Sequence, residues 1–564
     1  MTATGMLSEL ERIHRQYGPG LADRKLGLLD RLDRRTLPSA RAVSRLHEVL
    51  CFLRAYPDSP PVLEQVERML AGFARRRDLR RHAAALQDSG IAGTPTYYLF
   101  FHPTARWLAG RWPSRLTVSW PDVAPERLER LLPLIGLYAE TPGIDEVALP
   151  VRDWIRRMKW PDETDAVYLI RRVEALGAEP RLREIVFEDL GVMFKLAAGA
   201  DTPARTHARV DRGPVHYVTR PLDARRPDLR VALRERPRKV TVVPRDQALA
   251  LIDLAREAMV SRARDLDNFA YGDPDDVRII DMGDGLEFVA VGLVPERRLL
   301  LESVYGFLTL KNGVPIGYVL NSALYNSAEV AYNVFDTYRG GEAARVYGKV
   351  LAMLRHLFRA TDFTIYPYQL GGDGNDEGLK SGAWWFYQKL GFRPRDPGAR
   401  KLMNAELASM RQVPGHRSSM GTLKQLAAHN LYYRAGAARE DVIGIVPLAN
   451  VGLAVTDMLA RRFGSERDRA DRVLDGEVAR LLGVGSRRGW SDGERLGFAR
   501  WASVVAAIPG VADWPLAERR ALAEVMRAKG SRHESDFTLK FDRHRRLRRA
   551  IASLASHTLP GGSS

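Results

Sequence analysis

The stretch that decides the fold is Tyr332-Asn-Val-Phe-Asp-Thr-Tyr-Arg-Gly-Gly-Glu-Ala-Ala-Arg-Val-Tyr347. A strand predicted over 329–335 ends in it, and a helix predicted over 342–358 begins in it. The two glycines between them let backbone N–H groups approach an anion, and a helix start adds a partial positive charge. The pattern indicates a phosphate or pyrophosphate site, although turns of this composition also join strands and helices that bind nothing.

A second stretch, Ser381-Gly-Ala-Trp-Trp-Phe-Tyr-Gln-Lys-Leu-Gly-Phe-Arg393, follows one predicted strand (363–368) later. Several strands that we expect to be antiparallel precede both stretches, and Lys311-Asn-Gly313 predicts a hairpin turn among them. Antiparallel strands followed by alternating helices and strands are typical of an α+β domain with a mixed sheet.

Together the two stretches resemble the GNAT acyltransferase superfamily, whose members transfer acyl groups from acyl-coenzyme A. In that family a strand leads into an arginine- or glutamine-led, glycine-rich turn and then a helix. One strand later, a helix ends in a pattern that Phe386-Tyr-Gln-Lys-Leu-Gly-Phe392 matches here. The resemblance covers residues 238–400 and implies acetyl-coenzyme A or another acyl-coenzyme A as co-substrate.

The resemblance also implies a role for each matching position. Backbone amides of the turn would receive the coenzyme pyrophosphate, at Arg339, Gly340, Gly341, Ala343 and Ala344. The strand over 329–335, with Val334 near its end, would diverge from the next strand and hydrogen-bond the pantetheine arm. Asn375 would make a further coenzyme contact. Tyr387 would protonate the leaving thiolate, since a phenol can give its proton to a developing sulfur anion.

Glu342 departs from the family pattern, which has glycine at this position. A carboxylate beside a pyrophosphate would add bulk and like-charge repulsion of about 1 kcal/mol or more. We expect the side chain to point outward as an acid in the first helical turn, where the helix dipole favours it. The departure keeps open a GNAT fold that has lost catalysis.

A general base is needed if the acceptor is an amine. Glu329 begins the predicted central strand and Asp336 ends it, and either could act directly or through a water. Charged residues at strand ends are usually just solvated, so both assignments stay open. We take Glu329 and Tyr387 as the candidate catalytic residues.

Helical patterns fill the rest of the 564-residue chain, apart from a strand-like interruption at 116–120. Prolines and arginines are frequent in the segment 201–237, which predicts an extended connector. We therefore expect a helical N-terminal region (1–200), this connector (201–237), the GNAT-like domain (238–400) and a helical, basic C-terminal region (401–564).

The formal net charge of +17 invites a nucleic-acid interpretation, because a basic face is the electrostatic footprint of phosphate binding. Only twelve of the 86 basic residues are lysine, however, and GC-rich codon usage would give that ratio and scatter the charge. We interpret the densest cluster, Arg543-His-Arg-Arg-Leu-Arg-Arg549, as a solvated helix face or basic tail. Nucleic acid is a partner that the sequence allows but does not favour.

Cys51 is the only cysteine, which excludes internal disulfides and multi-thiolate metal sites. No histidines have the spacing of a metal-ligand motif, so we expect no metal. The start of the chain has no signal-like apolar run, and the most apolar stretch, 442–455, is too short to cross a bilayer. We expect a cytoplasmic protein without a membrane span.

These observations predict transfer of an acyl group, most simply acetyl, from acyl-coenzyme A to a small-molecule or peptide amine. One alternative is a GNAT-fold protein that binds a partner without catalysis. Another is a transferase that takes the acyl group from an aminoacyl-tRNA, as related folds do; it would show salt-sensitive tRNA binding.

Overall fold

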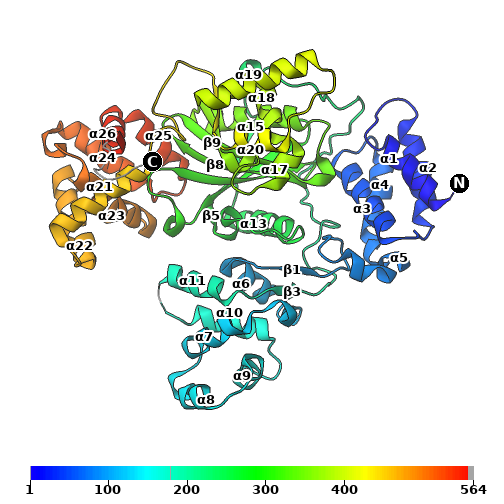
Figure 1. The fold of residues 1–564 in the computed structure, drawn as a ribbon, viewed down its shortest axis with the longest axis horizontal. Helices are drawn as coiled ribbons and strands as arrows, with labels where there is room; N and C mark the ends of the chain where they lie inside the picture. The colour runs from blue at the N-terminus through cyan, green and yellow to red at the C-terminus, as the bar shows by residue number, and fades with distance from the viewer. Residues whose placement is uncertain (1, 178, 557–564) are drawn as a thin grey trace.

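A nine-stranded sheet forms the centre of the structure, a computed structural model that describes residues 2–177 and 179–556 (Figure 1). Its strands lie in the order β11-β12-β10-β9-β8-β7-β6-β5-β4. Their bounds are β4 Lys239–Val242, β5 Gly272–Asp281, β6 Leu286–Leu293, β7 Ser303–Lys311, β8 Val314–Leu324, β9 Ser327–Val334, β10 Asp362–Ile365, β11 Arg393–Pro394 and β12 Leu431–Arg434. Neighbours are antiparallel except β9 and β10, which are parallel because a helix crosses between them.

The longest pair of strands, β7 and β8, is joined at the predicted hairpin turn. Asn312 and Gly313 have φ values of 50° and 75°, the left-handed conformation that a tight hairpin turn requires and that these residues tolerate. Pairing then continues from Lys311↔Val314 to Ser303↔Ala323.

Helices cover both faces of this sheet. α15 (Ala343–Phe358) packs on the face that carries Tyr305, whose ring centroid lies 5.5 Å from that of Phe358. α14 (Asp267–Ala270) lies on the opposite face, where a side chain at Gly306 would come within 2.7 Å of Asn268. The remaining helices of this part are α13 Arg245–Val260, α16 Pro367–Leu370, α17 Asp376–Ser381, α18 Ala383–Lys389, α19 Pro397–Gln412 and α20 Met420–Ala427.

The N-terminal region consists of two bodies with separate hydrophobic cores. The first holds α1 Ala3–Ile13, α2 Leu21–Asp33, α3 Ala40–Ala55, α4 Pro60–Gly72 and α5 Arg77–Arg81. The second holds α6 His102–Arg111, α7 Pro125–Ile135, α8 Thr141–Glu146, α9 Val151–Met158, α10 Asp165–Glu174, α11 Pro180–Leu190 and a small sheet of β1 Thr96–Tyr98, β3 Phe194–Leu196 and β2 Leu116–Val118. The sequence predicted only β2; all three strands are three residues long, and the small sheet forms by long-range pairing of β3 with β1 and β2.

Residues 201–237 run between the first N-terminal body and the sheet and contain one short helix, α12 (Leu229–Ala232). The Arg54 guanidinium donates to the Thr206 carbonyl at 2.7 Å, and the Val210 amide donates to the Gly313 carbonyl at 3.0 Å. This segment therefore ties α3 to the β7–β8 hairpin.

The C-terminal helices form a fourth hydrophobic core beside the sheet. They are α21 Ala449–Phe463, α22 Arg467–Leu482, α23 Asp492–Ala507, α24 Leu516–Ala528, α25 Ser535–Arg543 and α26 Arg545–Ser556. β12 belongs to the central sheet although it lies beyond residue 400, where the sequence placed the boundary and expected only helices to follow. The correction has a simple cause: β12 is four residues long and finds its partners only through tertiary pairing with β10 and β11.

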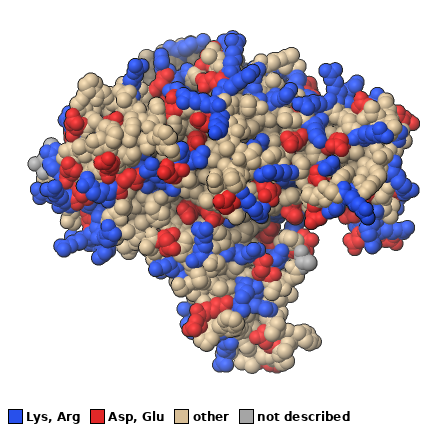
Figure 2. Space-filling view, turned by 180° about the vertical axis from the view of Figure 1, so that it is seen from behind, with Lys and Arg blue, Asp and Glu red and all other residues tan. Residues whose placement is uncertain are grey.

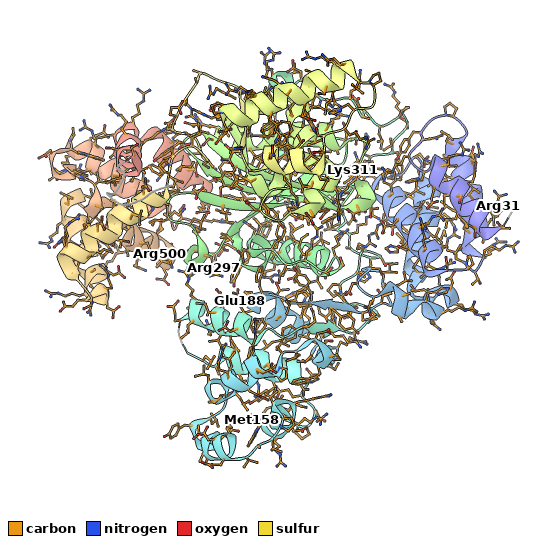
Figure 3. All side chains as sticks on the ribbon, in the orientation of Figure 1. Arg31, Met158, Glu188, Arg297, Lys311 and Arg500 are labelled. Atoms are coloured by element: carbon orange, nitrogen blue, oxygen red, sulfur yellow. The ribbon has the colours of Figure 1, made fainter. Side chains whose placement is uncertain are left out.

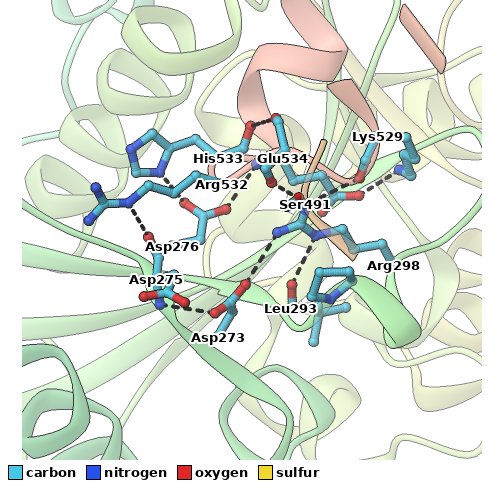
Figure 4. Close-up of polar contacts among 12 residues, drawn as sticks. Asp273, Asp275, Asp276, Leu293, Arg298, Ser491, Lys529, Arg532, His533 and Glu534 are labelled. Atoms are coloured by element: carbon cyan, nitrogen blue, oxygen red, sulfur yellow. Dashed lines mark hydrogen bonds and ion pairs between the residues drawn. The ribbon is translucent and has the colours of Figure 1, made fainter. Parts of the chain in front are cut away.

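A buried polar network attaches these helices to the sheet (Figure 4). The carboxylate of Asp276, with its side chain fully buried, accepts from the Tyr305 hydroxyl at 2.5 Å and from the Glu534 amide at 3.0 Å. The Lys529 ammonium lies 2.5 Å from the Glu534 carboxylate, and both side chains are almost fully buried. With these attachments, the expected α+β class with helical flanks is confirmed.

Candidate functional site

The two parallel strands of the sheet diverge at the candidate site. β9 and β10 pair at only three positions, Ser327↔Asp362, Ala328↔Phe363 and Glu329↔Thr364. β9 then continues for five more residues, 330–334, which pair with β8 on one side and with no strand of the described chain on the other. An unpaired strand edge offers a row of backbone donors and acceptors to an extended ligand.

The glycine-rich turn closes the far end of this open edge. A single 3-10 turn (336–338) follows β9, and Gly340 and Gly341 then adopt φ values of 85° and 55°. Within 340–344 of the described chain, only the Ala343 amide donates to a backbone acceptor, the Gly340 carbonyl at 3.2 Å. The other amides at this helix start, including that of Ala344, remain available to an anion.

Glu342 corrects one expectation, because its side chain does not point outward. It is about one-eighth exposed, and its two oxygens lie 3.2 Å from the Arg345 guanidinium and 3.8 Å from the Lys311 ammonium. Lys311 comes from the β7–β8 hairpin, on the side of the sheet that meets the N-terminal helices (Figure 3). Since two cations neutralise this carboxylate, it opposes an anion at the turn much less than the sequence suggested.

The N-terminal helices hold the turn from outside. The Arg15 guanidinium donates to the carbonyls of Arg339 at 2.6 Å and Thr337 at 2.9 Å. The buried Tyr338 hydroxyl donates to the Cys51 carbonyl at 3.3 Å. Sequence reasoning missed these supports, since more than 280 positions separate the partners along the chain.

Two residues predicted to bind the coenzyme use their side chains locally. The Arg339 guanidinium donates to the Val334 carbonyl at 3.2 Å and pairs with Asp336 at 2.8 Å and with Glu377. Asn375 is the N-cap of α17: its Oδ1 accepts from the Gly378 amide at 3.0 Å, while its Nδ2 donates to the Tyr368 carbonyl. Arg339 lies at the turn, but its backbone amide, the predicted coenzyme contact, donates to the Asp336 carbonyl at 3.2 Å. The Asn375 side chain stabilises its own loop.

Tyr387 lies at the open edge of β9. Its ring is buried against Tyr347 and Phe392, and the Tyr332 amide hydrogen-bonds to its hydroxyl oxygen. Burial raises the pKa of this hydroxyl well above its ordinary value, so the phenol stays protonated at neutral pH. A proton donor is thus placed beside the unpaired backbone.

Glu329 stands at the point where the two strands separate, three residues and about 10 Å along β9 from Tyr332. Burial, and then the nearby charge of Glu302, raise the pKa of Glu329 to about 7. Burial also raises the pKa of Glu302. In the described chain neither carboxylate has an ion pair or a side-chain hydrogen bond with a protein group. Glu302 carries no sequence signal, because only strand pairing brings it near Glu329.

Asp336, the other candidate base, lies at the opposite end of β9. Its side chain is four-fifths exposed and pairs with Arg339. The structure thus brings the turn, Val334, Tyr387 and Glu329 along one strand edge, and leaves Asp336 in solvent.

In the described residues there is no cluster of metal ligands, and the face in Figure 2 shows no continuous basic patch. Within the described residues, no three His, Cys, Asp or Glu side chains are arranged to hold a metal ion, and no helix is long and apolar enough to span a bilayer. On the face in Figure 2, basic side chains are interspersed with acidic ones. Arg548, which belongs to the densest basic cluster and lies on helix α26, pairs with Asp441 at 2.5 Å.

No protein family model, curated protein or solved structure matches this chain. Its function is therefore inferred from the geometry of the open strand edge.

Proposed function

We propose that the central domain is a GNAT-type acyltransferase that moves an acyl group from acyl-coenzyme A to an amine. The observation that carries the proposal is the limited pairing of β9 with β10. It leaves residues 330–334 without a strand partner on one side, between a carboxylate with a pKa of about 7 and a glycine-rich helix start. An extended amide-containing arm that ends in a pyrophosphate fits such an edge.

Each part of the reaction has a group in place for it. The pantetheine amides would pair with β9, and the pyrophosphate would meet the free amides at 340–344. Glu329 would take a proton from the ammonium form of the acceptor, whose nitrogen then attacks the thioester carbonyl. As the C–S bond breaks, Tyr387 would give its proton to the thiolate. The nitrogen of the tetrahedral adduct loses its second proton to solvent as the adduct collapses. The products are an amide and free coenzyme A; Glu329 releases its proton to solvent, and solvent reprotonates Tyr387.

The acceptor class follows from the two carboxylates. Glu302 and Glu329 lie close enough to raise the pKa of Glu329, and in the described chain neither carboxylate has an ion pair. The Lys529 ammonium donates to the Glu302 backbone carbonyl at 2.7 Å, and its charge acts to lower the pKa of Glu302. A primary ammonium placed between them would relieve their mutual repulsion. This favours an amine acceptor and an enzyme over a binding protein of the same fold. The mixed charges in Figure 2 give no support to an aminoacyl-tRNA donor.

The first prediction concerns the glycine turn. We expect acetyl-coenzyme A to bind the full chain with a micromolar Kd, and Gly341→Asp to weaken binding about 10–100-fold. A carboxylate about 5 Å from a pyrophosphate costs about 1–3 kcal/mol at a partly solvated site. Isothermal titration calorimetry measures both constants.

Gly341→Asn is the matched control, because asparagine has the shape of aspartate without its charge. Both residues tolerate the positive φ at this position, and both would meet the Leu222 side chain at 3.2 Å. The Gly341→Asn variant should bind the coenzyme with a Kd within a few-fold of that of wild type. Equal losses in the two variants would place the pyrophosphate elsewhere, and no heat at millimolar acetyl-coenzyme A would remove the acetyl donor.

A further inference from the structure

A second site lies between the second N-terminal body and the sheet, far from the open edge of β9. A cavity of about 680 Å³ separates α6 and α11 from α13 and α14. In Figure 1, α6 and α11 face α13. This volume falls within the range of about 300–1,000 Å³ that is typical of small-molecule sites, which often occur where domains meet. Its lining includes Gly272, at the start of β5, four strands away from β9. At about 4.8 Å per strand, this is about 19 Å.

One side of α6 borders this cavity. His102, Arg106, Trp107 and Arg111 all line it; His102 and Arg106, like Trp107 and Arg111, are four residues apart, the spacing that makes side chains neighbours on a helix surface. Gly110 is on the same face and has open space around its Cα. The helix therefore presents an indole, an imidazole and two guanidinium groups to an open volume.

Four buried polar atoms of lining residues have no hydrogen-bond partner in the described chain. They are His102 Nε2, Trp107 Nε1, Glu174 Oε2 and Arg183 Nε. His102 is 94% buried, and its Nε2 comes no closer than 3.3 Å to Glu174 Oε2. Such atoms are uncommon in folded proteins, and each one left unpaired is costly. Four in one cavity indicate that a ligand supplies the missing partners.

The charges of the cavity favour an anion. Arginine side chains outnumber carboxylates in the lining, at Arg106, Arg111, Arg183 and Arg256 against Glu174 and Glu184. A single oxygen of Glu174 serves two of them, Arg106 at 3.0 Å and Arg183 at 2.9 Å. Burial lowers the pKa of His102, so the imidazole adds a neutral donor or acceptor and not a further charge. Arg111 and Arg256 share Asp253 in the same way, at 2.7 and 3.5 Å, so each of the two arginine pairs has one carboxylate. A guanidinium cluster with fewer carboxylates than arginines is the usual binding partner of a phosphate group.

From these features we infer that the cavity binds a nucleotide. The base would lie against the Trp107 indole, whose ring is also near the Arg111 and Arg256 guanidinium groups. The unpartnered Nε2 of His102 and Oε2 of Glu174 would pair with polar atoms on the edge of the base, which alternate between donors and acceptors. The phosphate would join Arg106 and Arg183. This site is independent of the coenzyme at β9.

Calorimetric titration of the full chain with AMP, GMP, UMP and orthophosphate tests the inference. At least one nucleotide should bind with a micromolar Kd, and Trp107→Phe and Arg106→Gln should each weaken it at least tenfold. Trp120→Phe is the matched control: this half-buried tryptophan belongs to the same body, donates to Asp165 at 2.8 Å and does not line the cavity. The affinity of the Trp120→Phe variant for the nucleotide should stay within twofold of that of wild type.

Three results would overturn the inference. They are no heat from any nucleotide at millimolar concentration, orthophosphate binding as tightly as every nucleotide, and unchanged affinity in both cavity variants. Displacement of the nucleotide by saturating acetyl-coenzyme A would assign it to the coenzyme site and would overturn the inference too. If Trp107→Phe lowers the unfolding temperature, Arg106→Gln decides the matter, because the Arg106 side chain is about three-fifths exposed and its loss disturbs the core less.

Discussion

Glu329→Gln lowers kcat/KM for acyl transfer by about 10²–10⁴-fold, the usual range for the loss of a general base. Glutamine keeps the size of the side chain and its place at the point where β9 and β10 separate, but it cannot take a proton. The release of free coenzyme A follows the reaction, with an amine acceptor that supports turnover and a thiol reagent as the probe. Cys51 is 2% exposed, so the protein itself adds little signal.

The pH dependence of kcat/KM tests whether Glu329 acts as a base. A base must be deprotonated, so kcat/KM should rise about tenfold per pH unit below pH 7 and level off above it. Glu302→Gln is the matched variant, because it removes the neighbouring charge that helps to raise the pKa of Glu329. It should move the midpoint to lower pH and keep most of the activity. A Glu329→Gln enzyme with the wild-type profile would exclude Glu329 as the base.

The parts of the site that could be read from the sequence are local ones. The strand, the two glycines and the helix from Ala343 follow one another without a break, so residue preferences and spacing fix them together. The hairpin at Asn312 is equally local, because its turn residues alone select the conformation.

The orientation of Glu342 shows where local reasoning ends. A helix start favours an acid whichever way its side chain points. The direction of the Glu342 side chain depends on Lys311, a cation thirty-one positions earlier on the β7–β8 hairpin. The sequence predicted that hairpin without indicating that its lysine would lie beside the turn. An ion pair between distant segments depends on packing, which one sequence does not display.

The acidic pair is hidden from the sequence for a related reason. Glu302 precedes β7, and Glu329 lies on β9, two strands across the sheet. Val304 pairs with Ser322, and Ser322 pairs with Glu329, so the register of two hairpins brings the carboxylates near each other. A shift of either register by one residue would turn Glu329 to the other face. The position of the candidate base Glu329 beside Glu302 can therefore be predicted only when the strand register is known.

The buried ion pair beside this acidic site should dominate the stability of the C-terminal attachment. Lys529→Met leaves the Glu534 carboxylate, whose side chain is fully buried, without its cation, and should cost about 3–5 kcal/mol. For a cooperative unit of about 150–250 residues this lowers the unfolding midpoint by about 6–20 °C. Scanning calorimetry of the full chain measures the shift. Burial already raises the pKa of Glu534, so the difference in stability between the variant and wild type should shrink as the pH falls and protonation removes the unpaired charge.

A double-mutant cycle separates the lost pairing from a general disturbance. Lys529→Met with Glu534→Gln removes both charges, so the double variant should be more stable than Lys529→Met alone. Lys540→Met is the surface control: Lys540 lies 3.2 Å from Glu524 in the same helical region, but both side chains are about half exposed. Its loss should cost less than about 1 kcal/mol, because solvent screens an exposed pair. If Lys529→Met unfolded no earlier than Lys540→Met, the pair would be solvated, and the C-terminal helices would not be held on β7 by buried charge.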